Sequence, residues 1–228
     1  MLCLGLDTAS SRGSVALVDD GAVLANASLD PRGRPSCNLL EQIDLLLNGV
    51  HRTVHDLGGI GVALGPGSFT GVRIGMATAK GMAYALQIGL VGLSTLEAMA
   101  RVVSHGDAPQ GTLCSVMQAG RGEVYAAWFA MTHGEVVRLD ADRSWTPGDL
   151  AEALPEGTSA AGDGAELLQQ AARAAGRPLL LVDALPPLAP GLARWAGRSV
   201  VRGSGYQPGG LGPNYVRPSY AQKTRQPR

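Results

Sequence analysis

The chain has 228 residues, of which 45% are hydrophobic and 17% charged, and its formal net charge at pH 7 is zero. This composition excludes a disordered chain, and the length suits one large domain or two small ones. Because phosphate neutralisation dominates nucleic-acid affinity, the balanced charge also argues against a protein that grips nucleic acid by itself.

The cysteines and the N-terminus give no sign of export or membrane insertion. Cys3, Cys37 and Cys114 are odd in number and widely spaced, without a Cys-x-x-Cys pair, which argues against a disulfide framework or a zinc site. The first apolar run is too short for a signal peptide and has no basic segment before it. No window approaches the ~20 apolar residues of a membrane span. We therefore expect a cytoplasmic protein that does not contact membranes.

The first half of the chain predicts three strands followed by alternating helices and strands. Short apolar runs indicate buried strands, and Asp19-Asp20-Gly21 is a hairpin signal between two of them. Apolar residues at helical spacing indicate the helices. The expected strands are 2–6, 14–18, 22–28, 60–64 and 89–93, and the expected helices are 36–50, 72–86 and 94–104.

The second half repeats this order, although its residues do not repeat. The expected strands are 112–117, 123–131, 135–139, 159–162 and 179–182, and the expected helices are 147–154, 165–175 and 188–201. Two passes through one order predict an α/β fold of two tandem ribonuclease-H-like lobes, the actin-like ATPase (ASKHA) architecture, with mixed sheets covered by helices. We place an N-terminal actin-like lobe at residues 1–105 and a C-terminal one, with a basic tail, at 106–228.

A glycine-rich run, Gly65-Pro66-Gly67-Ser68-Phe69-Thr70-Gly71-Val72-Arg73-Ile74-Gly75, follows an expected strand and opens an expected helix. Amides at a helix N-terminus attract anions, but the run is neither a Walker loop nor a dinucleotide fingerprint. Local physics favours a tight turn that lets the helix pack close to the sheet. Asp7 ends the first expected strand. Its carboxylate either helps to place a metal and phosphates, as in kinases and ATPases of this fold group, or caps the turn that follows. The candidate nucleotide or anion ligands are Asp7, Thr8, Gly65, Gly67, Ser68 and Thr70.

Other catalytic signals are weak. His51 and His55 have the spacing of two metal ligands on one helix face, but glycines flank the pair and no third ligand is evident. We therefore predict no metal site. There is no Gly-x-Ser-x-Gly elbow for a nucleophilic serine. Where the second lobe would need an acidic residue near phosphates, it has Gln118, which weakens an ATP-hydrolysing interpretation.

The glycine-rich run resembles the hallmark of the TsaB (YeaZ) family. Four other stretches agree with that family and fall in the right order along nearly the whole chain. They are Asp7-Thr8-Ala9 with Ser14-Val15-Ala16-Leu17, the third helix Leu93-Ser94-Thr95-Leu96-Glu97-Ala98-Met99-Ala100, the hairpin Gly122-Glu123-Val124-Tyr125, and the C-terminal Asn214-Tyr215-Val216-Arg217.

The resemblance implies a subunit without a working active site and with no cofactor of its own. It implies that the chain serves the machinery that puts threonylcarbamoyl on tRNA adenosine (t6A), by binding and supporting TsaD, the homologous transferase subunit that holds the metal. The implied further partners are the ATPase TsaE, a second copy of the chain when alone, and tRNA through the complex. ATP or ADP is a candidate ligand at the partner interface.

By the same resemblance, the helices after the first three strands form both the homodimer and the TsaD contact. Carried over by position, partner binding falls on Leu39, Leu40, Ile43, Leu47, Arg73, Met76, Ala77 and Lys80. The chain departs from the family pattern at Gln118-Ala119-Gly120, where relatives often have Asp-Ala-Arg, and at Pro35, where many have His. Both departures argue against a residual nucleotide role.

Two other functions stay open beside this one: an ATPase or small-molecule kinase of the same fold, and a metallopeptidase, an old label for the wider family. The first depends on Asp7 and the glycine turn, and the second on the two histidines. The tail from Arg217 to Arg228 is mildly basic, which suits either contact with RNA or a solvated terminus.

Overall fold

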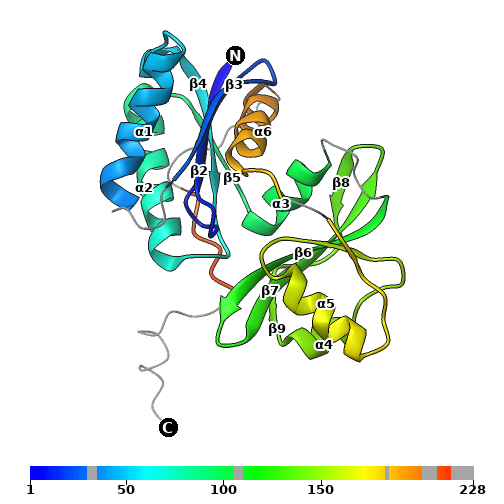
Figure 1. Cartoon of the computed structure of the whole chain (residues 1–228). Coiled ribbons are helices and arrows are strands. Elements are labelled where there is room, and N and C mark those ends of the chain that lie inside the picture. The colour runs from blue at the N-terminus through cyan, green and yellow to red at the C-terminus, as the bar shows by residue number, and fades with distance from the viewer. Residues whose placement is uncertain (30–34, 105–109, 183–184, 202–209, 217–228) are drawn as a thin grey trace.

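The computed structural model describes residues 1–29, 35–104, 110–182, 185–201 and 210–216, with the backbone alone described at 35–38 and 201. The chain forms two sheets, which lie one above the other in Figure 1. The first sheet has the order β3-β2-β1-β4-β5, in which β1, β2 and β3 are antiparallel neighbours and β4 and β5 continue in parallel. Its strands are β1 (Leu2–Asp7), β2 (Ser14–Asp19), β3 (Ala22–Ser28), β4 (Leu57–Ala63) and β5 (Gly89–Leu93).

Helices cover both faces of the first sheet, which explains why β1 is an almost continuous apolar run with every residue buried. On one face lie α1 (Pro35–Gly49) and α2 (Phe69–Leu86), and on the other lies α6 (Ala189–Val201) (Figure 1). Between α1 and β4 the chain makes a 3₁₀ turn, η1 (Val54–Asp56). The helices whose apolar side chains cover the two faces therefore come from opposite halves of the chain.

The second sheet repeats the topology of the first, with the order β11-β10-β6-β7-β8 and β9 paired to β7. One of its faces packs on α4 (Pro147–Glu152) and α5 (Ala165–Ala174), and α3 (Thr95–Val103) contacts β6 and β7. Its strands are β6 (Gly111–Gly120), β7 (Glu123–Thr132), β8 (Glu135–Arg138), β9 (Arg143–Trp145), β10 (Ser159–Ala161) and β11 (Leu180–Leu181). The predicted pair of mixed sheets covered by helices is confirmed.

Every predicted helix and strand is present, with ends that shift by a few residues. Two short elements, η1 and β9, were not predicted. The residues that meet at the lobe boundary predicted after residue 105 lie outside the described ranges, and that boundary stays a prediction. Helix α6 follows the boundary in sequence but packs on the first sheet, where a Cβ on Gly5 would lie 1.9 Å from the Ala189 carbonyl oxygen. The first sheet thus needs the C-terminal part of the chain to complete its core.

Candidate functional site

The glycine-rich run packs α2 directly against the end of β1. A Cβ on Gly71 would lie 1.8 Å from the Thr8 carbonyl oxygen, and one on Gly75 would lie 2.3 Å from Thr8 Oγ1. Thr8 Oγ1 donates a hydrogen bond of 2.6 Å to the Gly71 carbonyl. At the N-terminus of α2, Ser68 Oγ accepts from the Gly71 amide at 3.1 Å and thereby caps the helix. These contacts support the tight-turn interpretation over an anion site.

Asp7 caps the turn that follows β1. Its side chain is fully buried, and its Oδ1 accepts hydrogen bonds from the amides of Ala9 at 3.0 Å and Ser10 at 3.1 Å, while Oδ2 accepts from Ser10 Oγ. Burial raises the pKa of the Asp7 carboxyl, and the bonds from Ser10 and Ala9 oppose that rise. A carboxylate occupied in this way serves the backbone turn, and its oxygens already have partners within the chain.

We expect Asp7→Asn to keep the fold and to change how stability depends on pH. A raised folded-state pKa means that the native state holds the proton more tightly than the unfolded chain does. The stabilisation from this group is therefore complete below the unfolded pKa of about 3.9 and is lost as pH rises through the folded pKa. Asparagine does not titrate, so urea unfolding from pH 3 to pH 7 should show a shallower fall in stability for the variant. Parallel profiles would contradict this assignment.

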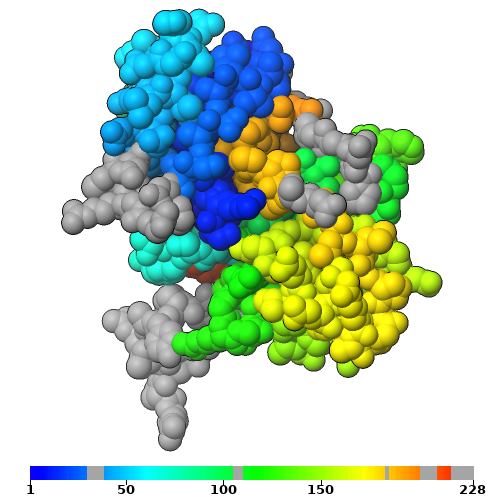
Figure 2. All heavy atoms as spheres, in the orientation of Figure 1, coloured from blue at the N-terminus to red at the C-terminus, as the bar shows by residue number. Residues whose placement is uncertain are grey.

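A cleft between the two sheets has a volume of about 440 Å³. Figure 2 shows the N-terminal segment (dark blue) directly above the second lobe (yellow) in this region. Ser11 Oγ, from the turn after β1, donates to Asp163 Oδ2 at 2.7 Å across the cleft. The other oxygen of Asp163 accepts from the Gln118 amide at 2.9 Å, and Gln118 Nε2 donates to the Asp163 carbonyl at 2.9 Å. Asp163 therefore joins the turn after β1 to the last part of β6.

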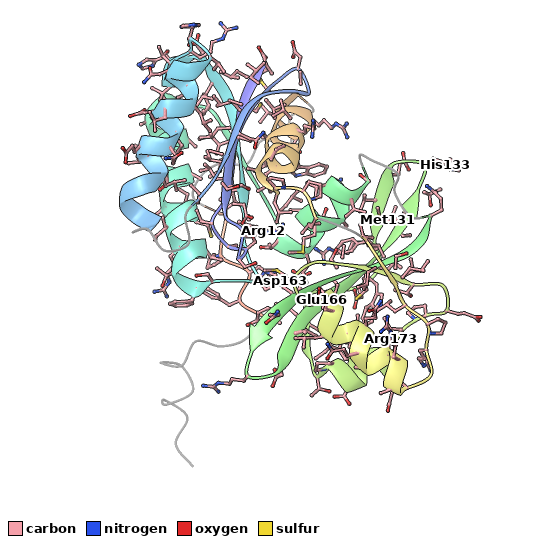
Figure 3. The ribbon with its side chains drawn as sticks, viewed as in Figure 1. Arg12, Met131, His133, Asp163, Glu166 and Arg173 are labelled. Atoms are coloured by element: carbon pink, nitrogen blue, oxygen red, sulfur yellow. The ribbon has the colours of Figure 1, made fainter. Side chains whose placement is uncertain are left out.

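The charges of the cleft also disfavour a polyphosphate. Figure 3 places Arg12, Asp163 and Glu166 between the two sheets, and all three line the cavity. Two carboxylates against one guanidinium give the walls no positive surplus to attract phosphate groups. The carbonyl of the candidate ligand Gly65 accepts a hydrogen bond from the Thr95 amide at 2.8 Å, which ties this turn to the start of α3. Some of the six predicted anion ligands lie close to one another, but the contacts they make are those of two closely packed backbone segments.

The two histidines do not share a helix face. His51 follows α1 with a φ of 55°, His55 lies in η1, and both are exposed. Among the described residues no group of three His, Cys, Asp or Glu side chains could hold a metal ion. Burial raises the pKa of the Cys3 thiol to about 11 and of the Cys114 thiol to about 12, so both stay protonated and pack as small apolar side chains.

Half of the predicted partner-binding residues are buried inside the chain itself. The side chains of Leu39, Ile43, Leu47 and Met76 face the core of the first sheet with at most 6% of their surface exposed. They are the apolar stripes that hold α1 and α2 on the sheet, and the assignment of a partner contact to these four needs correction. Leu40 is 54% exposed, Arg73 and Ala77 are exposed, and Lys80 is partly buried.

The outward surface of α1 and α2 carries further exposed apolar side chains beside Leu40 and Ala77. Leu45 is 56% exposed and Tyr84 is 72% exposed. Gly81 is exposed, and a Cβ at this position would meet no atom within 4 Å. Small residues on an exposed helix let another helix approach closely. We call this surface the outer helical face; its members are Leu40, Leu45, Ala77, Gly81 and Tyr84.

Comparison with known proteins places the chain in a family. A family model described as TsaD, tRNA N6-adenosine threonylcarbamoyltransferase, matches residues 36–143. The tRNA threonylcarbamoyladenosine biosynthesis protein TsaB of Bacillus subtilis is 32% identical over 156 residues, which cover 68% of this chain and 67% of that protein. The chain belongs to the TsaB family.

Solved structures agree with this membership of the TsaB family. YeaZ from Pseudomonas aeruginosa superposes with a TM-score of 0.77 at 27% identity, over 93% of this chain and all of that chain. A ROK hexokinase from Thermus thermophilus superposes with a TM-score of 0.52 at 14% identity, over 88% of this chain and 100% of that one. The hexokinase shows a shared fold alone, and together these neighbours confirm the predicted actin-like architecture.

Among the described residues, no helix is long and apolar enough to cross a membrane.

Residues 210–216 return to the first lobe, although they follow the second lobe in sequence. We call residues 210–216 the C-terminal strap, which runs beside α2 (Figure 1, red). Lys80 Nζ donates to the Leu211 carbonyl at 2.6 Å, and the Asn214 amide donates to the Leu64 carbonyl at 2.7 Å. Lys80 is therefore occupied by the chain itself, which the sequence-based assignment to a partner did not foresee.

The strap ends in an aromatic cluster at the start of α2. The rings of Phe69 and Tyr215 stack with centroids 5.2 Å apart, and Arg73 Cζ lies 3.8 Å from the centre of the Phe69 ring. Arg73 Nε also donates to Tyr215 Oη at 3.0 Å. The three side chains come from positions 69, 73 and 215, so only the folded chain brings them together.

Proposed function

We propose that this chain is a non-catalytic subunit of the t6A modification machinery, and that it binds a TsaD homologue through its outer helical face. The observation that carries the proposal is a set of exposed apolar or small residues on two adjacent helices, with Ala77, Gly81 and Tyr84 in one row along α2. Apolar and aromatic side chains around a small residue are the composition of a helix-packing interface. The membership of the TsaB family and the match of residues 36–143 to a TsaD model support the choice of partner.

The absence of catalysis is supported by what surrounds the cleft. Asp7 is buried in a turn, and Asp163 ties Ser11 to Gln118 where phosphates would enter. An ATPase or kinase needs a free carboxylate for its metal and donors for its phosphates. We propose in addition that TsaE and tRNA join through the complex, that the chain self-associates when alone, and that ATP or ADP binds at the partner interface.

Gly81 offers a sharp test of this surface. We expect Gly81→Arg to fold normally, because a side chain there meets open solvent, but to block close approach of a partner helix. Co-expressed with its TsaD homologue, wild-type protein should co-elute on size exclusion and Gly81→Arg should not, with an affinity at least about tenfold weaker. Tyr84→Ala should weaken the complex by about tenfold or more, as truncation of an interface tyrosine commonly does.

Gly81→Ala is the matched control, because it fills the same space with one methyl group and should preserve the complex. An exposed residue of the second lobe, Leu180→Ala, controls for loss of apolar surface in general and should also co-elute. Separate elution of wild-type protein and TsaD, with TsaE and nucleotide present, would overturn the proposal. Equal co-elution of Gly81→Arg and wild type would move the interface to another surface.

A further inference from the structure

The cleft between the two sheets presents two opposite charges that the chain itself does not pair. Arg12, in the turn after β1, and Glu166, in the first turn of α5, both line the cavity of about 440 Å³. Within the described part of the chain, neither the guanidinium nor the carboxylate makes a hydrogen bond or an ion pair. They come from different lobes and border the same space (Figure 3). The cleft therefore offers one free donor group and one free acceptor group to a bound molecule.

The space around Arg12 extends beyond this cleft. Arg12 also lines a second cavity of about 370 Å³, which shares Ser11, Leu185 and Pro187 with the first. Both volumes fall in the range of small-molecule sites, about 300–1,000 Å³. The two adjoining cavities leave room beside the guanidinium for a molecule longer than a single small ion.

Much of the cleft wall is apolar. Met99 and Leu188 are each only 2% exposed, and Leu181, Val182 and Leu185 are partly buried. An apolar wall with a small number of charged or polar groups is the usual composition of a ligand pocket. A molecule that fills this cleft should therefore have an apolar body as well as charged groups.

Charge complementarity narrows the ligand to one class. Two carboxylates, those of Asp163 and Glu166, line the cleft together with the Arg12 guanidinium. Both oxygens of Asp163 already accept hydrogen bonds, from the Gln118 amide and the Ser11 hydroxyl, whereas Glu166 accepts none within the described residues. A ligand with only a negative charge would face two carboxylates, and one with only a positive charge would face the guanidinium. A ligand that carries both charges satisfies Arg12 and Glu166 together.

We propose that the cleft binds a small zwitterion with an apolar body, of the class of a free amino acid or a short peptide. Its carboxylate pairs with Arg12, its ammonium group pairs with Glu166, and its apolar part lies on the wall that includes Leu185. The ligand thus joins the two lobes. This binding is independent of the proposed function, since no residue of α1 or α2 is among the described residues that line the cleft.

Leucine and two analogues that each lack one of its charges test the class of ligand. 4-Methylpentanoate keeps the carboxylate and lacks the ammonium group, whereas 3-methylbutylamine keeps the ammonium group and lacks the carboxylate. NMR titration of the ¹⁵N-labelled full chain measures dissociation constants in the millimolar range, and the amides of Gly162 and Glu166 report on the cleft. Leucine should shift these amides. Each analogue should bind about tenfold more weakly or worse, because it leaves one charged side chain without charge-assisted hydrogen bonds.

Two variants assign the ends of the ligand. Arg12→Gln should weaken leucine binding by about tenfold and leave 3-methylbutylamine within about twofold of its wild-type affinity. Glu166→Gln should weaken leucine binding equally and leave 4-methylpentanoate within about twofold. Both side chains are exposed and unpaired within the described residues, so neither change should disturb the fold. Arg173→Gln, which removes an exposed cation of α5 that does not line the cleft (Figure 3), is the matched control and should keep the wild-type affinity.

The dipeptide alanyl-leucine separates the two sources of a zwitterion. Tighter binding of the dipeptide than of leucine would identify a short peptide as the ligand, and weaker binding would identify a free amino acid. Three results would overturn the inference: equal binding of leucine and either analogue, unchanged leucine affinity in both variants, or cleft amides that neither leucine nor the dipeptide shifts. Co-elution with TsaD should persist in Arg12→Gln and Glu166→Gln. Failure of wild type to bind TsaD would reject the proposed function and leave the leucine titration unaffected.

Discussion

Replacing Gly71 with alanine is expected to destabilise the protein by about 3 kcal/mol or more, which is large for the addition of one methyl group. The new Cβ would lie 1.8 Å from the Thr8 carbonyl oxygen, a distance that no non-bonded pair tolerates. Both atoms belong to the backbone or are fixed to it, so no side-chain rotation relieves the clash. Either α2 or the turn after β1 must move. Forced displacement in a packed region typically costs about 1–3 kcal/mol, and a clash between two backbone segments belongs at the upper end of that range or above it.

Gly81→Ala in the same helix should have the opposite effect. Its Cβ meets nothing within 4 Å, and an exposed helical glycine replaced by alanine gains roughly 0.5–1 kcal/mol. Urea unfolding of both variants and the wild type would measure the two free-energy changes in one experiment. Similar effects at the two positions would mean that the glycine-rich run does not require close contact with Thr8.

This contrast separates two uses of glycine in α2. Gly71 and Gly75 face inward and set the distance between the helix and the end of β1, whereas Gly81 faces solvent. The glycine-rich run thus positions α2, the helix that carries Ala77, Gly81 and Tyr84 of the outer helical face. A change at Gly71 should consequently weaken partner binding as well, by displacing the whole of α2.

Much of the fold could be predicted because the relevant signals are local. Buried strands such as β1 are continuous apolar runs, and Ser94 and Thr146 cap α3 and α4 where polar residues precede helical patterns. The short strand β9 could not be predicted, because three residues are too few to show alternation. Its place beside β7 depends on pairing with residues about 20 positions away.

The candidate surfaces were harder to predict than the fold. Helical periodicity groups Leu39, Ile43 and Leu47 on one face, but it does not say whether that face meets the sheet or a partner. The structure puts the stripe inside, so the exposed Leu40 and Leu45 lie off it. The aromatic cluster at the start of α2 joins residues more than 140 positions apart through an irregular strap, and no sequence period reports such a contact.

Asp142 is the second position where a single change should have a large effect. Its side chain is 4% exposed and accepts hydrogen bonds from Ser94 Oγ at 2.6 Å, from Arg138 Nη1 at 2.7 Å and from Asn214 Nδ2. These partners come from the start of α3, the second sheet and the C-terminal strap. One carboxylate therefore connects the two lobes to the strap, whose far end carries Tyr215.

We expect Asp142→Ala to destabilise the protein by about 2–4 kcal/mol, because three buried or partly buried donors lose an acceptor at once. Asp142→Asn keeps one acceptor oxygen and should recover part of the loss. Asp149→Ala, which removes an exposed carboxylate from the first turn of α4, should cost no more than about 1 kcal/mol. Urea unfolding at pH 7 would measure all three.

The effect on the strap distinguishes a carboxylate that connects three parts of the chain from an ordinary buried acid. Asn214 also donates its side-chain amide to the Gly65 carbonyl at 3.4 Å, a long bond that is weak without the carboxylate. Loss of Asp142 should therefore loosen residues 210–216 before the sheets unfold, and hydrogen exchange at Asn214 should rise above that of β1. Unchanged exchange at Asn214 would instead mean that the Leu64 contact and the aromatic stack hold the strap by themselves.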